Sequence, residues 1–284
     1  MKIKQYIMKI RQGILLIAIS ISSVCSVFSQ KEAKDFVIKQ YDSLTQDVVY
    51  LVLTDSILYS NEAISQMTYF NELDSVAKED IEARYLLIGN LIDYSVALNE
   101  FKNELVRSLE AVGFRVVVTK AENLPDVLSP YEHSLNVAQL ELEEYATIDS
   151  IQNNSSSKPY VYRKTLNGIR FNAWFLYNEK DTSSSLTLFC NEETADYFAG
   201  EITLKQGKPS VTYNITKINP NDAYRVSFFT GRTSAIYFFN LLLNKYVFLK
   251  TDGRDTNYYG IDFNSGNLLM DGAPFDNFDV IESL

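Results

Sequence analysis

The feature that most constrains this fold is the run from about 233 to 246, which is apolar on nearly every side of a helix. Ile236, Phe238, Phe239 and the leucines 241–243 leave no continuous polar stripe. Such a helix is enclosed by protein or crosses a bilayer, and about 14 residues fall short of the roughly 20 that a crossing takes. We expect it to be buried against a sheet. The alternative is docking into a partner protein or against a membrane leaflet.

The first thirty residues have the three parts of an export signal. A basic stretch without acids comes first (Lys2, Lys4, Lys9 and Arg11). An apolar run from Ile14 to Val24 follows, and Val27 and Ser29 are small enough for a signal peptidase site. We therefore predict a signal peptide over 1–29, with Gln30 as the mature N-terminus. The alternative is a lipid-bearing N-terminus at Cys25, although Val24 is bulky for such a site.

The charge of the chain excludes one class of function. There are 26 basic and 36 acidic residues, a net charge of −10, and removal of 1–29 leaves 22 basic residues and a charge of −14. Nucleic-acid binding is disfavoured because its affinity comes chiefly from Lys and Arg. Attraction to anionic lipid is weakened likewise, so membrane contact is expected only through a lipid at Cys25 or through a partner. Cys190 remains alone after cleavage, and we expect a buried thiol without a disulfide.

The part from 30 to 151 alternates between helical and strand periods, which predicts an α/β sandwich domain. The expected helices cover Ala33–Leu44 and Leu98–Val112, the second ended by Gly113. The expected strands are Val48–Leu53, Tyr85–Ile92, Phe114–Thr119 and Ala138–Glu143. In the last of these, glutamates alternate with apolar residues, which indicates one wet face.

The polar segment 152–159 has the composition of a linker or a long loop, and we place a domain boundary there. From 160 to 284 we expect a mainly antiparallel β domain with the buried helix at 233–246, so the fold class is α+β. Asn167–Gly168 is a hairpin-turn signal, and Glu192–Phe198 reads as a short helix. The other expected strands are 160–166, 169–177, 186–190, 201–205, 210–217, 224–229, 258–263 and 267–270.

No catalytic or cofactor-binding set stands out. His133 is the only histidine, in a loop-like stretch, so a tetrahedral zinc site of the usual ligands cannot be built within one chain. The glycines match no phosphate-binding spacing. An acidic group near the C-terminus is interpreted as solvated (Asp252, Asp255, Asp271, Asp276 and Asp279). We therefore predict no cofactor and no metal, although carboxylates distant in sequence can converge in a fold.

Aromatic residues are abundant, with 19 Tyr, 17 Phe and one Trp. Phe171, Trp174 and Phe175 fall in an expected strand, where such rings usually pack the core or its rim. Tyr258 and Tyr259 beside Gly260 are the better candidates for a binding surface, because flanking turns should leave at least one ring near solvent.

The unit 85–119, in which a strand leads into the helix Phe101–Leu109 and then into a strand after Gly113-Phe114, resembles small α/β domains of Gram-negative outer-membrane assembly lipoproteins and periplasmic accessory proteins. The stretches 134–145 and 231–240 are similar to secreted envelope proteins without an assigned activity. The resemblance implies no catalytic residue. We expect a non-catalytic exported protein, in the periplasm, on the periplasmic face of the outer membrane or secreted, that binds other envelope proteins. A glycan-binding or glycan-hydrolysing module is the alternative.

Overall fold

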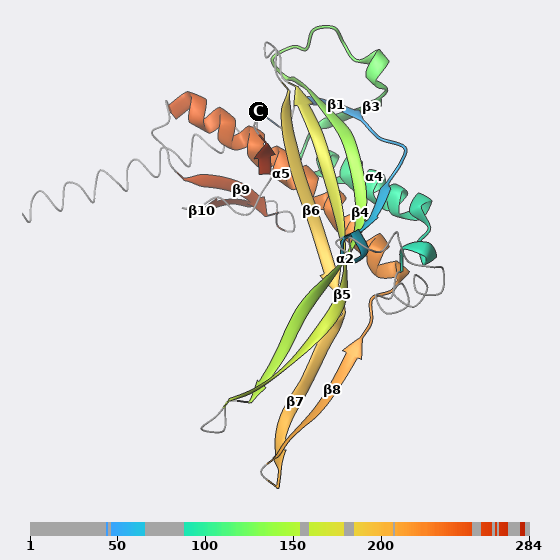
Figure 1. Cartoon of the computed structure of the whole chain (residues 1–284). Coiled ribbons are helices and arrows are strands. Elements are labelled where there is room, and N and C mark those ends of the chain that lie inside the picture. Colours follow the sequence, from blue (N-terminus) through green and yellow to red (C-terminus); the bar gives the residue numbers. More distant parts are fainter. Residues whose placement is uncertain are drawn as a thin grey trace, which may run out of the picture. The chain divides into compact units, whose positions relative to one another are not determined.

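The computed structural model describes residues 44, 47–65, 88–153, 159–178, 185–206, 208–251, 257–262, 265, 267–271 and 279–281. The fold is α+β, with a mixed sheet and two long helices (Figure 1). The chain divides into a larger unit, Gln46–Phe239 with Pro274–Leu284, and a smaller unit, Met1–Thr45 with Asn240–Ala273. The expected helix 33–44 and the signal peptide lie outside the described residues, Leu44 excepted.

The sheet of the larger unit has the strand order β11-β6-β5-β4-β1-β3, with β2 also paired to β4. Parallel pairs join β4 to β1, β1 to β3 and β4 to β2, whereas β4, β5, β6 and β11 are antiparallel. The strands are β1 (Val48–Val52), β2 (Leu58–Asn61), β3 (Arg115–Thr119), β4 (Glu132–Asn153), β5 (Tyr160–Asn178), β6 (Leu186–Ala195) and β11 (Asp279–Ile281).

Helix α4 (Tyr94–Ala111) confirms the clearest helix expected from the sequence. It begins where the Asp93 side chain accepts hydrogen bonds from the backbone N–H groups of Ser95 and Val96. It ends before Gly113, whose φ of 109° favours glycine. Its apolar stripe is buried, and β3 follows directly as predicted.

Helix α5 (Pro220–Thr251) is 32 residues long and contains the expected apolar helix, whose Phe238, Phe239 and Leu242 are buried as predicted. The strand expected at Tyr224–Phe229 is wrong, because this segment is the first part of α5. The buried stripe there is built from small and hydroxyl residues, such as Ser227 and Thr230, whose hydroxyls bond carbonyls one turn earlier. None of the described helices is long and apolar enough to cross a membrane.

The domain boundary expected at 152–159 falls within one hairpin, and its residues 154–158 lie outside the described residues. β4 and β5 pair from Ser134 with Asn178 to Asn153 with Tyr160, so the chain between them joins the two strands of one hairpin. The turn predicted at Asn167–Gly168 is also wrong, since both residues lie inside β5. A Cβ atom on Gly168 would overlap the ring of Tyr145, and the glycine therefore makes room for this ring.

The helix expected at Glu192–Phe198 is a strand pair instead. β6 runs to Ala195, and a separate hairpin follows, made of β7 (Tyr197–Lys205) and β8 (Lys208–Thr216). The buried Asp196 lies between β6 and β7 and accepts hydrogen bonds from the backbone N–H groups of Asn167 and Ile218. These bonds connect the start of the β7–β8 hairpin to β5 and to the segment that follows β8.

Three short helices complete the described part of the larger unit: α2 (Glu62–Ser65), η2 (Gly89–Leu91) and η3 (Ala121–Asn123). The strand expected at 85–92 is wrong, because Gly89–Leu91 form the helical turn η2. Residues 85–87 lie outside the described residues. The buried Glu144 carboxylate accepts the backbone N–H of Gly89, which fixes this helical turn against β4. Burial raises the pKa of Glu144.

The described part of the smaller unit contains the end of α5 and the hairpin of β9 (Tyr258–Asp262) and β10 (Asn267–Asp271), both of which were predicted. Two amide side chains of α5 hydrogen-bond the backbone of β9. Asn244 donates to the Tyr259 carbonyl at 2.7 Å and accepts its N–H at 2.9 Å, and Asn240 accepts the N–H of Ile261 at 3.1 Å. These amides take the place of a neighbouring strand.

Cys190 is buried in β6, as predicted, and burial raises the pKa of its thiol to about 12. Only the thiolate reacts with disulfide reagents, so the folded protein should be almost inert. We expect no fast labelling by Ellman's reagent at pH 8 and one thiol per chain in denaturant when the chain begins at Gln30. Fast labelling in native buffer from such a chain would contradict this burial.

Candidate functional site

The candidate site lies on the face of the sheet opposite helices α4 and α5. The antiparallel registers of β4, β5 and β6 align nine residues in three rows, and directly paired residues project to the same side. We call these nine residues the site face. The rows are Gln139–Trp174–Phe189, Glu141–Asn172–Asn191 and Glu143–Arg170–Glu193.

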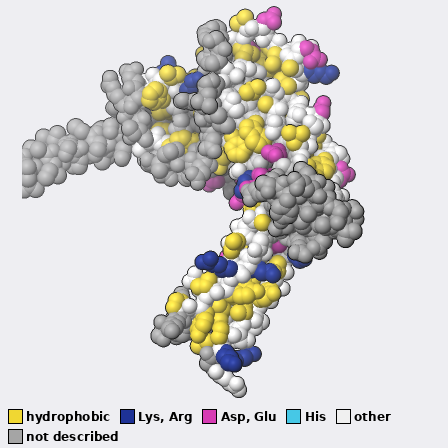
Figure 2. All heavy atoms as spheres, viewed as in Figure 1, with side chains coloured by type: hydrophobic (Ala, Val, Ile, Leu, Met, Phe, Trp, Pro, Cys, Tyr) yellow, Lys and Arg dark blue, Asp and Glu magenta, His cyan; other side chains and the backbone are white. Residues whose placement is uncertain are grey.

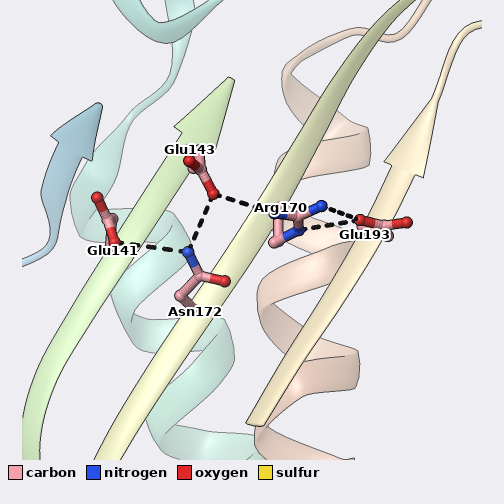
Figure 3. Close-up of polar contacts among 5 residues, drawn as sticks. All are labelled: Glu141, Glu143, Arg170, Asn172 and Glu193. Atoms are coloured by element: carbon pink, nitrogen blue, oxygen red, sulfur yellow. Dashed lines mark hydrogen bonds and ion pairs between the residues drawn. The ribbon is translucent and has the colours of Figure 1, made fainter. Parts of the chain in front are cut away.

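A polar network crosses the site face (Figure 3). The amide nitrogen of Asn172 donates to Glu141 at 3.5 Å and to Glu143 at 3.3 Å. Arg170 pairs with Glu143 at 3.4 Å and with Glu193 at 2.8 Å. Asn172 is buried, and its Oδ1 atom has no hydrogen-bond partner among the described residues. Three carboxylates face one guanidinium, which leaves an excess of two negative charges.

Aromatic rings flank the network on both sides. Trp174 and Phe189 lie with ring centroids 4.9 Å apart in the first row. At the other end, the guanidinium of Arg170 lies 4.8 Å from the centre of the Tyr145 ring, which is a cation–π distance. Burial raises the pKa of Tyr145 to about 12, so its phenol stays protonated and can donate a hydrogen bond.

The opposite face of the same strands forms the core. Phe171 and Phe175 of β5 lie 5.5 and 6.5 Å from the ring of Phe101 in α4, and Thr230 of α5 donates to the Phe171 carbonyl. Both helices lie behind the sheet in Figure 3. The strand periodicity thus predicted the core positions of Phe171 and Phe175 correctly, whereas Trp174, one residue out of step, belongs to the site face.

His133 is not in a loop. It lies in β4 and is buried on the helix side, where its Nε2 atom is 3.0 Å from Asp47 and its Nδ1 atom 3.1 Å from the Tyr177 hydroxyl. The rings of Phe114 and Phe238 contact it edge-on. His133, Asp47 and Tyr177 therefore form a hydrogen-bonded cluster inside the core, and a substrate cannot reach the imidazole.

The candidates from the sequence lie elsewhere. Tyr259 is only 1% exposed, so it is a core residue of the smaller unit and no surface candidate, while Tyr258 is half-buried and its binding role stays a prediction. Cys25 lies outside the described residues, as do Asp252, Asp255 and Asp276. Among the described residues, no group of three or more acids, cysteines or histidines has the spacing of a metal site.

The site face offers binding groups. It contains no Ser, Cys, His or Lys, the side chains that usually serve as nucleophile or general base in acyl transfer. It does contain planar amide, carboxylate and guanidinium groups beside rings, all of which orient a ligand. The sequence indicated only part of it, through the alternating Glu141 and Glu143. Arg170 and Asn172 were missed because the turn expected at 167–168 hid their pairing with β4.

No family model and no curated protein matches the chain. Among solved structures, the chain is similar to a Helicobacter pylori protein described as a neuraminyllactose-binding hemagglutinin homologue. The TM-score is 0.32 and the identity 9%, with 72% of this chain and 90% of that chain covered. A similarity of this size carries no argument about fold, family or ligand.

Proposed function

We propose that this chain is a non-catalytic binding protein of the cell envelope, an accessory or scaffold subunit of an outer-membrane or secretion assembly. Its site face receives a segment of a partner protein. The observation that carries the proposal is the gathering of Trp174, Phe189, Arg170 and Tyr145 around one polar network on a sheet face opposite the helices. Trp, Tyr and Arg are the residues that most often concentrate binding energy at protein interfaces.

The exposure of the site face fits this role. Trp174, Phe189 and Arg170 are half-buried, and Gln139 and Asn191 at its margin are exposed. Protein interfaces are enriched in aromatic residues and Arg and have a polar, solvent-accessible rim. The excess of two negative charges favours a partner segment that carries Lys or Arg.

The proposed location follows from the sequence. A signal peptide over 1–29 would export the chain, and either Gln30 or a lipidated Cys25 would be its first residue. Tagged protein purified from crosslinked cell envelopes, with the N-terminus read by mass spectrometry, tests both points. An unprocessed Met1 in the mature pool would overturn the export part of the proposal.

Trp174→Ala tests the site face. Truncation of a central Trp typically costs about 2 kcal/mol of binding, or roughly 30-fold in Kd. We expect the variant to recover the crosslinked partner at least tenfold less well than the wild type. Tyr131→Ala, which truncates a 63% exposed ring outside the site face, is the matched control. Equal recovery by both variants would contradict a partner at the site face.

Glycan binding is the second candidate, and the same residues carry it. Trp174 and Phe189 offer ring faces for a sugar, beside two carboxylates and an amide that can hydrogen-bond hydroxyl groups. A glycan array and a panel of chromogenic glycosides test it. Binding or cleavage that is lost in both Trp174→Ala and Glu143→Gln would favour this function over protein binding, and two blank results would remove it.

A further inference from the structure

Two hairpins of the larger unit extend as an arm (Figure 1). The arm consists of β4 from Tyr145, β5 up to Gly168, and the β7–β8 hairpin. Tyr162 of β5 stacks on Tyr213 of β8 with centroids 5.5 Å apart, and both rings contact Phe198 of β7. Near the turns, Asn153 donates to the carbonyl of Ile202. The described ends of the two hairpins therefore lie together, and we call this end the tip.

The tip has a charge opposite to that of the rest of the chain. The described residues that form it, 150–153, 159–164, 202–206 and 208–212, contain no Asp or Glu in a protein with a net charge of −10. Their basic residues are Arg163, Lys164, Lys205 and Lys208. The nearest acids of these strands, Asp149 and Glu201, lie at the inner limit of the tip, opposite Lys164 and Thr212. Lys205 and Lys208 pair directly across the β7–β8 turn.

Apolar side chains are exposed among these charges. Val161 is 49% exposed and Leu204 is 44% exposed, one on each hairpin close to its turn. Toward the free end of the arm, Figure 2 shows yellow apolar and dark blue basic side chains side by side on the drawn face. Basic residues interleaved with aromatic and aliphatic ones are typical of segments that lie in a membrane interface.

The basic residues of the tip favour a lipid bilayer over an acidic protein as its binding partner. Three of the four described basic residues are Lys, which protein interfaces disfavour, whereas Lys readily places its apolar stem along lipid and its charge at the headgroups. β7 and β8 form a two-stranded sheet, so their outer edges need water for hydrogen bonding, and contact is confined to the headgroup layer.

We propose that the tip docks on the surface of an anionic lipid bilayer. The net charge of the whole chain predicts repulsion from such lipid. That charge is the sum of an acidic remainder and a basic tip, so it does not describe the tip itself. Because the acidic remainder is repelled, docking is restricted to an orientation in which the tip meets the membrane. This contact is independent of the partner proposed for the site face.

Co-sedimentation with vesicles tests the proposal. The full chain is mixed with vesicles of phosphatidylcholine, with or without 40% phosphatidylglycerol, about that fraction being enough to give a strongly negative surface. We expect binding only to the anionic vesicles and a steep loss of binding in high salt. Each basic residue near such a surface strengthens binding about fivefold, so Lys205→Gln with Lys208→Gln should weaken it roughly 25-fold.

Arg115→Gln with Lys120→Gln is the matched control, since it removes two exposed charges outside the arm. All variants are compared with the same N-terminus, read by mass spectrometry, so that a lipid or leader contributes equally. Leu204→Ser should weaken the binding that persists in high salt. Equal binding of the tip and control variants would overturn the proposal. Binding of the tip to polyglutamate without binding to anionic vesicles would overturn it too, in favour of an acidic protein.

Discussion

His133→Ala is expected to lower the free energy of unfolding by about 3–5 kcal/mol, as is usual when one partner of a buried charged or hydrogen-bonded pair is removed. Both ring nitrogens of His133 have partners in the core, Asp47 and Tyr177. The other carboxylate oxygen of Asp47 already lacks a hydrogen-bond partner among the described residues. Without the imidazole, the carboxylate would be buried next to an empty space. Urea unfolding followed by circular dichroism measures the change.

Tyr177→Phe is the control for this prediction. It removes one hydroxyl and keeps the ring that packs on Phe238 at 5.2 Å. A single lost hydrogen bond with one unsatisfied nitrogen should cost about 1–2 kcal/mol, well below the cost of His133→Ala. If His133→Ala were as stable as Tyr177→Phe, the histidine would not be the centre of this buried group.

Gly231→Ala is expected to destabilise the protein by about 1–3 kcal/mol through overpacking, although alanine is the better helix former by about 1 kcal/mol. Gly231 lies where α5 crosses α4. A Cβ atom there would lie 2.5 Å from the Phe101 carbonyl oxygen and 3.1 Å from the Leu105 nitrogen. Both are backbone atoms of a packed helix and cannot rotate away, so the two helices must separate. Thermal and urea unfolding report the sign of the effect.

Glu100→Ala is a useful comparison, because it makes an exposed change on α4 away from the crossing and should stay within about 0.5 kcal/mol. A Gly231→Ala variant more stable than the wild type would show that the helices tolerate a wider spacing. The close approach would then not be required by the fold.

Much of the larger unit could be predicted from local patterns. α4, with its apolar stripe and Gly113, and the strands β1 and β3 follow the ordinary helical and strand periods. The buried part of α5 was recognisable because a helix without a polar side has to be enclosed. The secondary structure of these elements is determined by residues close together in the sequence, so it can be predicted from one sequence.

The predictions from sequence were wrong where contacts between distant segments determine the secondary structure. Gly168 looks like a turn residue, but the ring of Tyr145 from another strand occupies the space above it. Ser227 and Thr230 hid the helical stripe at the start of α5 because their hydroxyls are satisfied inside the helix. The site face was missed for the same reason. Arg170 and Glu143 are 27 residues apart in sequence, and only the register of the long hairpin brings them together.

Site-specific photocrosslinking tests the central claim, that the site face is where this protein binds its partner. A photoreactive amino acid is placed at Asn191, which is exposed in the middle row, and in a second strain at Asn99, which is exposed on α4 behind the sheet. We predict a discrete adduct in living cells from position 191 that is lost with Trp174→Ala, and none from position 99. An adduct from position 99 alone, or one from position 191 that persists with Trp174→Ala, would contradict the claim.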